Sequence, residues 1–200
     1  MRKYLSCNNR GRSAVFFLFV AILLSKQAYA NCKDETEEMG DVSYSSNKAV
    51  SFGNWRTYVD SNPNMCWAIS KPTSGEIILE KNNESNCRMD AALSFSYFMD
   101  DITEGEIMYF SGTVLDNTKP AYLYIDDYMF SLGTVEGPNA WAKNSVLDRD
   151  IFDALGKAEL ARIVSITNDG SVFSDTFKLD GFQNAANLAF DFCQNLTGEL

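Results

Sequence analysis

The sequence predicts a mainly β domain, a β-sandwich or barrel-like fold, with one short internal helix and a C-terminal helix packed on the sheet. Short runs in which apolar and polar residues alternate recur at intervals of about ten residues, as in domains built from many short strands. Clusters of Gly, Pro, Asn and Asp separate these runs and indicate turns. The last 20 residues instead carry apolar residues at steps of three and four, which indicates a helix with one buried face.

The first thirty residues have the three parts of a secretory signal peptide. A basic beginning precedes the apolar run Ala14–Leu24, and Ala28-Tyr29-Ala30 is a small-x-small cleavage site. A transmembrane anchor is the alternative, but an eleven-residue apolar run is about half of the roughly 20 residues that a spanning helix needs. We therefore expect cleavage after Ala30, a periplasmic or secreted location, and a mature chain with no transmembrane segment.

The charge of the chain limits the classes of partner. The 200 residues carry a net charge of −10, and removal of residues 1–30, with five basic and no acidic residues, changes it to −15. Such a surface repels the phosphates of nucleic acids and of anionic lipids. The sequence therefore disfavours nucleic-acid binding and electrostatic attachment to a membrane.

The first half of the mature chain reads as a polar leader followed by strands. Residues 31–48 are acidic and rich in turn formers, and they predict an extended leader before a single β-rich domain over 49–200. Alternation predicts strands over Val50–Val59 and Met65–Ser70, and a short strand over Ile77–Leu79.

The centre of the chain predicts further strands. Alternation extends over Ala91–Met99 and Ile107–Leu115. The runs Ala121–Ile125 and Tyr128–Leu132 predict a hairpin, because only two acidic residues separate them. The segment Ala140–Ala142 follows a Gly-Pro-Asn turn.

The last third of the chain predicts two strands between two helices. Asp148–Ala158 has acids in its first turn and an apolar face, which favour a short helix. The runs Ala161–Thr167 and Val172–Leu179 predict a hairpin across Asn168-Asp169-Gly170. Asp180 is then expected to cap the final helix, whose apolar positions are Phe182, Ala185, Ala186, Ala189, Phe190 and Cys193.

Four cysteines remain after the expected cleavage: Cys32, Cys66, Cys87 and Cys193. An even number in an exported chain indicates two disulfides, with three connectivities open. A zinc site is disfavoured because the chain has no histidine and no two of the four cysteines are close in sequence.

The sequence gives little support to catalysis, and we assign no catalytic, cofactor-binding or metal-binding residue. Serine and cysteine nucleophiles usually need a histidine base, which the chain lacks. Ser45 and Lys48 have S-x-x-K spacing but lie in the polar leader, so we interpret them as a chance match. Two acidic groups are candidates for hydrolysis or calcium binding, and three tryptophans for carbohydrate binding. These are Asp100, Asp101, Glu104 and Glu106, then Asp126 and Asp127, and Trp55, Trp67 and Trp141. More commonly, however, such acidic residues are simply solvated, and such tryptophans belong to the core or its rim.

Several segments together resemble the invasion-associated locus B proteins, a family of bacterial exported β-rich proteins. The family pattern opens on FGDW, continues with C-Y-x-x-S-x-P-T and A-W-A, and ends on D-T-Y-S-L-x-G-F before a helix with a terminal cysteine. The matching segments here are Phe52-Gly53-Asn54-Trp55, Cys66–Ser74, Ala140-Trp141 and Asp175–Phe182, followed by Ala185, Ala186, Ala189 and Cys193.

Three features depart from the family pattern. The central L-F-V-T-H-R-P is replaced by Leu93–Met99, which lacks the histidine and the arginine. The basic R-G-T turn is replaced by Asp169-Gly170-Ser171, and Cys32 and Cys87 have no counterpart. Any contact that those basic groups make in relatives is therefore in question here.

The resemblance implies a non-enzymatic envelope or periplasmic protein that acts in host-cell invasion or envelope maintenance through an envelope or host protein. It also implies a disulfide between Cys66 and Cys193, the two cysteines that match, which leaves Cys32 for Cys87. The alternative is a small carbohydrate-binding or hydrolytic domain that uses the acidic segments and the tryptophans.

Overall fold

The computed structural model describes residues 49–59, 65–81, 88–98 and 101–197 of the chain. The predicted signal peptide, its cleavage site at Ala30, the leader over 31–48, Cys32 and Cys87 lie outside these residues. Within the described part of the chain, no helix combines the length and the apolar character needed to span a membrane.

The strands form two antiparallel sheets, of seven and of five strands. The larger sheet has the order β1-β2-β3-β5-β6-β10-β9, and the smaller has the order β4-β12-β11-β7-β8. The strands of the larger sheet are β1 (Val50–Phe52), β2 (Trp55–Val59), β3 (Met65–Ser70), β5 (Ala92–Phe98), β6 (Asp101–Phe110), β9 (Thr134–Glu136) and β10 (Asn139–Trp141). Those of the smaller are β4 (Ser74–Leu79), β7 (Ala121–Ile125), β8 (Tyr128–Leu132), β11 (Leu160–Ile166) and β12 (Val172–Lys178).

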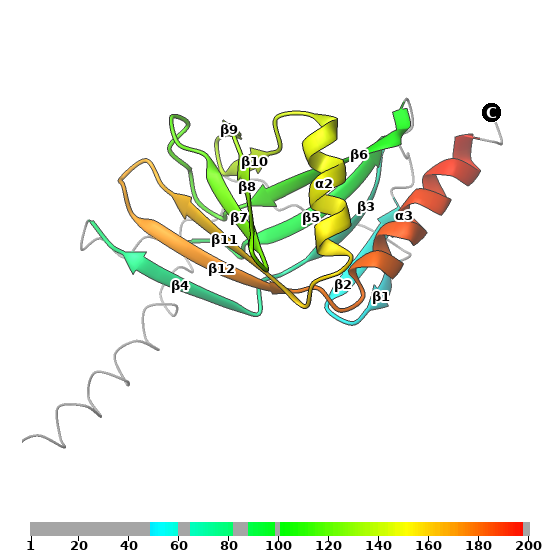
Figure 1. Ribbon diagram of the computed structural model, residues 1–200, viewed down its shortest axis with the longest axis horizontal. Coiled ribbons are helices and arrows are strands. Elements are labelled where there is room, and N and C mark those ends of the chain that lie inside the picture. Colours follow the sequence, from blue (N-terminus) through cyan, green and yellow to red (C-terminus); the bar gives the residue numbers. More distant parts are fainter. Residues whose placement is uncertain (1–48, 60–64, 82–87, 99–100, 198–200) are drawn as a thin grey trace, which may run out of the picture. The chain divides into compact units, whose positions relative to one another are not determined.

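The smaller sheet and two helices together cover one face of the larger sheet (Figure 1). Helix α2 (Ser145–Leu155) packs on β6, and helix α3 (Phe182–Thr197) packs mainly on β2, β3 and β5. Buried side chains from both sheets and both helices form one hydrophobic core. Neither sheet closes on itself among the described strands, so the predicted mainly β fold takes the sandwich form and not the barrel form.

The prediction of one strand over Val50–Val59 is wrong. The chain reverses at Gly53 and Asn54, so β1 and β2 form a hairpin in which Phe52 pairs with Trp55. Gly53 has φ +54°, and a Cβ there would lie 2.2 Å from Asp180 Oδ2, so the turn needs glycine. The alternation hid this turn because the residues on both sides of it are apolar.

The strand predicted over Ile107–Leu115 is displaced. β6 begins at Asp101 and ends at Phe110, and Leu115 makes only an isolated bridge to Thr167. Gly112 ends the run with φ +75°, where a Cβ would lie 2.0 Å from the Met89 carbonyl oxygen. Only glycine fits at this position, because its φ is positive and the Met89 backbone lies so close. The strand therefore ends before Gly112.

The remaining predicted elements are present with small shifts of their ends. The strand over 65–70 and both strands of the 121–132 hairpin have the predicted bounds. The internal helix α2 begins at Ser145, before the predicted Asp148, because Asn144 caps it by accepting a hydrogen bond from Leu147 N at 3.1 Å. The side chain of Asp148 instead accepts a hydrogen bond from Ile107 N at 2.9 Å, beyond the end of β10, and thereby joins α2 to β6.

The predicted cap of the final helix is wrong. α3 begins at Phe182, and the residue before it is Gly181, with φ +89°. A Cβ at Gly181 would lie 1.9 Å from the Phe52 carbonyl oxygen, so glycine lets the start of α3 approach β1. The Asp180 carboxylate accepts a hydrogen bond from the Asn54 side chain and therefore holds the β1–β2 turn.

Candidate functional site

The buried face of α3 lies against β2, β3 and β5. Its residues Phe182, Ala185, Ala186, Ala189 and Cys193 are fully buried, as the apolar spacing predicted. Small alanines bring the helix backbone close to the sheet, and Thr57 Oγ1 on β2 donates a hydrogen bond to the carbonyl oxygen of Ala185 at 2.8 Å. The helix is thus attached by close packing and by a side-chain hydrogen bond to one of its carbonyl oxygens.

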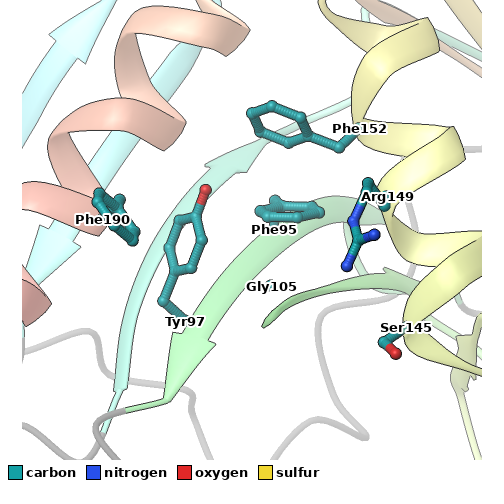
Figure 2. Close-up of a pocket in the computed structure, with 7 residues that line it drawn as sticks. All are labelled: Phe95, Tyr97, Gly105, Ser145, Arg149, Phe152 and Phe190. Carbon is teal, nitrogen blue, oxygen red and sulfur yellow. The ribbon is translucent and has the colours of Figure 1, made fainter. Parts of the chain in front are cut away.

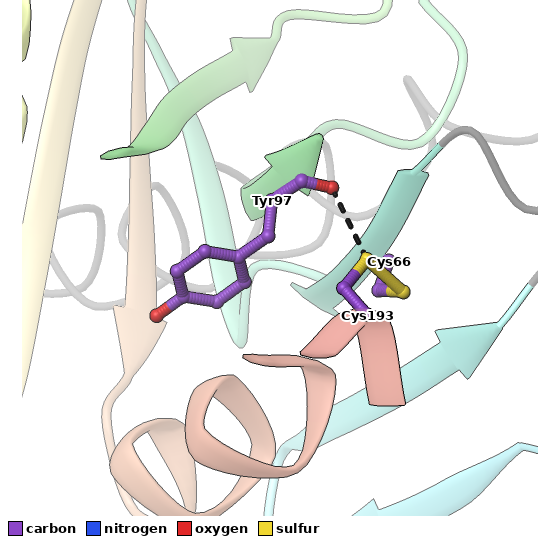
Figure 3. Close-up of a disulfide and its surroundings, with 3 residues drawn as sticks. All are labelled: Cys66, Tyr97 and Cys193. Carbon is purple, nitrogen blue, oxygen red and sulfur yellow. Dashed lines mark hydrogen bonds between the residues drawn. A yellow bond between two sulfur atoms is a disulfide. The ribbon is translucent and has the colours of Figure 1, made fainter. Parts of the chain in front are cut away.

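A disulfide between Cys66 and Cys193 joins β3 to the end of α3 (Figure 3). The Cα atoms are 5.8 Å apart, within the usual range for a disulfide, and both cysteines are fully buried. Cys193 Sγ also lies 3.6 Å from the Tyr97 carbonyl oxygen on the neighbouring strand. This is the pairing that the family resemblance implied.

A cavity of about 200 Å³ lies between α2, α3 and the larger sheet (Figure 2). Sequence reasoning did not find it, because its walls come from four separate segments. The residues that line it are Phe95, Tyr97, Gly105, Ser145, Arg149, Phe152 and Phe190.

Aromatic rings form most of the cavity wall. The ring of Phe95 lies 5.4 Å from that of Tyr97 and 4.9 Å from that of Phe152, and Tyr97 lies 5.4 Å from Phe190 in an edge-to-face arrangement. Gly105 on β6 makes room for this cluster, since a Cβ there would lie 2.0 Å from Phe95 Cε1. The cavity therefore combines an aromatic wall with the polar groups of α2.

Polar groups reach the same cavity from strand β5 and from helix α2. The Tyr97 side chain points into the space beside Phe190 (Figure 2), while Arg149 and Ser145 project from α2. Tyr97 is only 8% exposed. Burial raises the pKa of Tyr97 to about 12, so the hydroxyl keeps its proton at physiological pH and remains a donor.

A buried ion pair links the two sheets at the other end of the larger sheet. Arg88 Nη1 donates to Asp175 Oδ1 at 2.9 Å, and Nη2 donates to Tyr109 Oη at 3.0 Å. The Tyr109 hydroxyl in turn donates to Asp175 Oδ2 at 2.5 Å and contacts Ser165 Oγ at 3.3 Å. Burial, and then the negative charge of Asp175, raise the pKa of Tyr109.

The polar groups of this network satisfy one another. The side chains of Arg88 and Asp175 are 7% and 1% exposed, and the Arg88 guanidinium lies 4.6 Å from the Phe173 ring centroid. We interpret it as a structural link and not as a catalytic site. Its signals in the sequence were the charged residue Asp175 in an otherwise buried strand and the arginine Arg88 shortly before another strand, β5.

The structure does not bring the candidate acidic residues together. Asp126 and Asp127 form the exposed β7–β8 turn, in which Asp126 has φ +49°. Asp101, Glu104 and Glu106 belong to strand β6 of the other sheet, while Asp100 lies outside the described residues. Within the described segments, no group of three or more potential ligands is placed to hold a metal ion.

The three tryptophans also lie apart. Trp55 is fully buried, donates from Nε1 to the Lys178 carbonyl oxygen at 3.0 Å, and packs edge-on against Phe182. Trp67 lies on β3 and stacks on Tyr58, with the ring centroids 6.0 Å apart. Trp141 lies on β10, and strands β5 and β6 separate β10 from β3 in the sheet. Their arrangement therefore offers no shared carbohydrate platform. Ser45 and Lys48, with S-x-x-K spacing, lie outside the described residues.

Comparison with known proteins gives information on the fold. No protein-family model and no curated protein sequence matches the chain. Among solved structures, the chain is similar to invasion associated protein B from Bartonella henselae, with 16% sequence identity and a TM-score of 0.50. The match covers 74% of this chain and 99% of that protein. At this identity the similarity concerns the fold, so the chain shares the two-sheet fold of invasion associated protein B.

Proposed function

We propose that this chain is an exported, non-enzymatic protein of the invasion-associated locus B type, which acts in the periplasm or at the envelope by binding a protein or envelope component. The observation that carries the proposal is the fold similarity, which extends over 99% of invasion associated protein B. That protein is named for its association with invasion and not for a reaction.

The disulfide supports an extracytoplasmic location. Stable disulfides are rare in the reducing cytosol and common in exported proteins, and Cys66–Cys193 closes a sequence separation of 127 residues. The signal-peptide pattern before Ala30 agrees with this location, and we propose that the second disulfide joins Cys32 to Cys87. The exported product then consists of the acidic leader and one β-rich domain.

The chemistry of the cavity supports binding rather than catalysis. Among the described residues, its lining includes no histidine, cysteine or carboxylate that would act as a base or nucleophile. Its polar groups are a tyrosine hydroxyl, a serine hydroxyl and a guanidinium, which recognise a ligand by hydrogen bonding and charge. A hydrolase that uses the acidic residues is less well supported, because Asp126–Asp127 and Glu106 lie in different sheets.

Cell fractionation combined with intact mass measurement tests the proposal. We expect the protein in the periplasmic or secreted fraction, cleaved after Ala30, with a mass lower by two hydrogens for each of two disulfides. A cytoplasmic protein that retains residues 1–30 and free thiols would contradict it. Crosslinking the exported protein in its own envelope then identifies the partner. The hydrolytic alternative would be favoured if the protein hydrolysed a glycan and the double variant Asp126→Asn, Asp127→Asn lost this activity.

A further inference from the structure

We propose that the outer edge of strand β8 binds an extended segment of a partner protein, which adds to the smaller sheet as a further strand. The segment has apolar side chains at alternate positions and a basic residue at the end that lies beside Asp126 and Asp127. This inference rests on the proposed function, in which the protein acts by binding a partner, and it names the surface that the partner contacts.

Strand β8 lies at one end of the smaller sheet and, among the described strands, pairs only with β7. The outer side of such an edge strand presents backbone N–H and C=O groups with which a further strand can pair. The side chains of Tyr128 and Met129 are 64% and 60% exposed, whereas Leu132 is fully buried. The part of the edge that is open to solvent is therefore the stretch from Tyr128 to Ser131.

The two-residue turn of the β7–β8 hairpin determines which backbone groups point outward. Ile125 pairs with Tyr128 across this turn, and the pair next to such a turn exchanges both of its backbone hydrogen bonds. Hydrogen-bonded and non-hydrogen-bonded pairs then alternate along an antiparallel ladder. The backbone N–H and C=O groups of Met129 and Ser131 therefore point away from β7, toward the position of an added strand.

Strand β8 lacks the features that usually protect an edge strand. Its sequence, YMFSL, has no proline and no charged residue, and its pairing with β7 is regular over all five residues. Strand β4, at the opposite edge of the same sheet, also exposes apolar residues, but its register with β12 shifts at Ile78, which has no direct partner there. Such a bulge bends a strand and interrupts its ladder. Of these two edges, β8 is the one with a regular ladder for an added strand.

The side chains of β8 favour apolar residues in the added strand. Tyr128 and Phe130 lie on one face of the sheet with their rings stacked, and the ring centroids are 6.2 Å apart. Aromatic side chains pair well with aromatic and β-branched residues on a neighbouring strand. An added strand with apolar residues at alternate positions therefore gains contacts with these two rings.

The charge around this edge favours a basic segment. Asp126 and Asp127 are exposed in the turn directly before β8, and Glu136 is exposed on β9, which follows β8. The sequence between Lys119 and Lys143 contains no lysine or arginine. A basic residue at the end of the added strand therefore lies beside two carboxylates and meets no basic residue of this stretch.

Neither a nearby arginine nor a second copy of the chain changes this preference. Arg162 belongs to β11, which β7 separates from β8, and its guanidinium lies 4.6 Å from the ring centroid of Tyr124. A second copy fits the edge less well, because each copy carries a net charge of −10 and the two repel each other.

Capped peptides test the inference on the purified full chain. The probe alternates valine and threonine over six residues and ends in two lysines, which lie beside the β7–β8 turn when the peptide pairs antiparallel to β8. We expect a dissociation constant of roughly millimolar order at low salt. Saturating peptide should slow hydrogen exchange of the Met129 and Ser131 amides about fivefold, with a smaller change at Tyr128 and Phe130. A peptide that is N-methylated along its backbone should not bind, because it has no N–H to donate.

Variants connect the binding to the edge and to its charge. Ser131→Pro removes an outward N–H and keeps the ladder with β7, so binding should be lost while the melting temperature shows that the variant folds. Asp126→Asn with Asp127→Asn should weaken the lysine peptide about fivefold and leave a peptide ending in two serines unchanged. Asparagine tolerates the positive φ of +49° at position 126. The matched control, Asp150→Asn with Asp153→Asn, removes two exposed charges from α2 and should change neither affinity.

Three results would overturn the inference. One is equal binding of the N-methylated and the unmodified peptide, which would show that backbone pairing is not involved. Another is unchanged hydrogen exchange at Met129 and Ser131 with saturating peptide. The third is a dimer in analytical ultracentrifugation that Ser131→Pro prevents, which would assign the edge to a second copy. These results leave the proposed exported location untouched, because cell fractionation tests that location separately.

Discussion

The two ends of the larger sheet are covered in different ways. At one end the smaller sheet packs on it, and the buried network of Arg88, Asp175 and Tyr109 fills the polar part of the interface. At the other end two helices cover the sheet and leave a cavity between them, and the Cys66–Cys193 disulfide attaches α3 covalently to β3. The comparison suggests that a filled interface can be held by noncovalent contacts, whereas a helix that borders an open space gains most from a crosslink.

The largest predicted effect concerns the end held by the disulfide. In the chain-entropy model, a crosslink that closes about 100 residues is worth about 4.7 kcal/mol, and here the separation is 127 residues. The double variant Cys66→Ser, Cys193→Ser should therefore lose about 4 to 5 kcal/mol of unfolding free energy, measured by urea denaturation. Addition of reductant to the variant Cys32→Ser, Cys87→Ser, which keeps only Cys66–Cys193, is the matched control and should give a similar loss. A loss below about 1 kcal/mol would contradict this role.

The next effect concerns the end held by the ion pair. Asp175→Asn keeps the shape of the side chain but leaves Arg88 without its buried counter-charge, and we expect a loss of about 3 to 5 kcal/mol in urea denaturation. Asp90→Asn is the control, because Lys71 and Asp90 lie 2.6 Å apart but are 73% and 77% exposed. Exposed pairs contribute about 0 to 1 kcal/mol, so equal losses in both variants would argue against the distinction.

A smaller effect on stability measures what the hydrogen bond under α3 contributes beyond close packing. Thr57→Val removes the hydrogen bond to the Ala185 carbonyl oxygen and keeps the volume of the side chain. Thermal or urea unfolding should show a loss of about 1 kcal/mol. Thr134→Val, at an exposed position on edge strand β9, serves as the control and should change stability by less than about 0.5 kcal/mol. If Thr57→Val left the unfolding free energy unchanged, packing alone would hold the helix.

The smallest effect is a pH dependence near α2. Burial, and then the charge of Asp148, raise the pKa of Glu106, so the folded state binds its proton more tightly than the unfolded state. Glu106 therefore lowers the unfolding free energy as pH rises from its ordinary pKa through its raised pKa. Because the side chain is partly exposed, we expect Glu106→Gln to raise the melting temperature slightly at pH 7 and to leave it unchanged well below pH 4. A stabilisation that is larger in acid than at pH 7 would contradict the sign.

The sequence predicted the fold where local patterns decide it. Period-2 alternation placed β3, β7 and β8, and the apolar spacing of Phe182, Ala185 and Ala189 identified the buried face of α3. The β1–β2 hairpin and the end of β6 were missed because they depend on close backbone approaches across the fold. Gly53 meets Asp180 and Gly112 meets Met89, and no local pattern records such contacts.

The candidate site could not be predicted from the sequence for the same reason. Its Phe95, Arg149 and Phe190 come from a strand and two helices that are distant along the chain, and each alone reads as a core or surface residue. The acidic and tryptophan candidates were prominent in the sequence but fell in different sheets or in the core. Residue type alone therefore did not indicate which side chains share a cavity.

Native-state hydrogen exchange of the original chain and of the variant Cys66→Ser, Cys193→Ser tests the difference between the two ends most directly. We expect that loss of Cys66–Cys193 accelerates exchange of the α3 amides much more than exchange in β11 and β12, because the ion pair still holds the two sheets together. Equal acceleration in α3 and in these strands, or earlier opening of the strands, would contradict it.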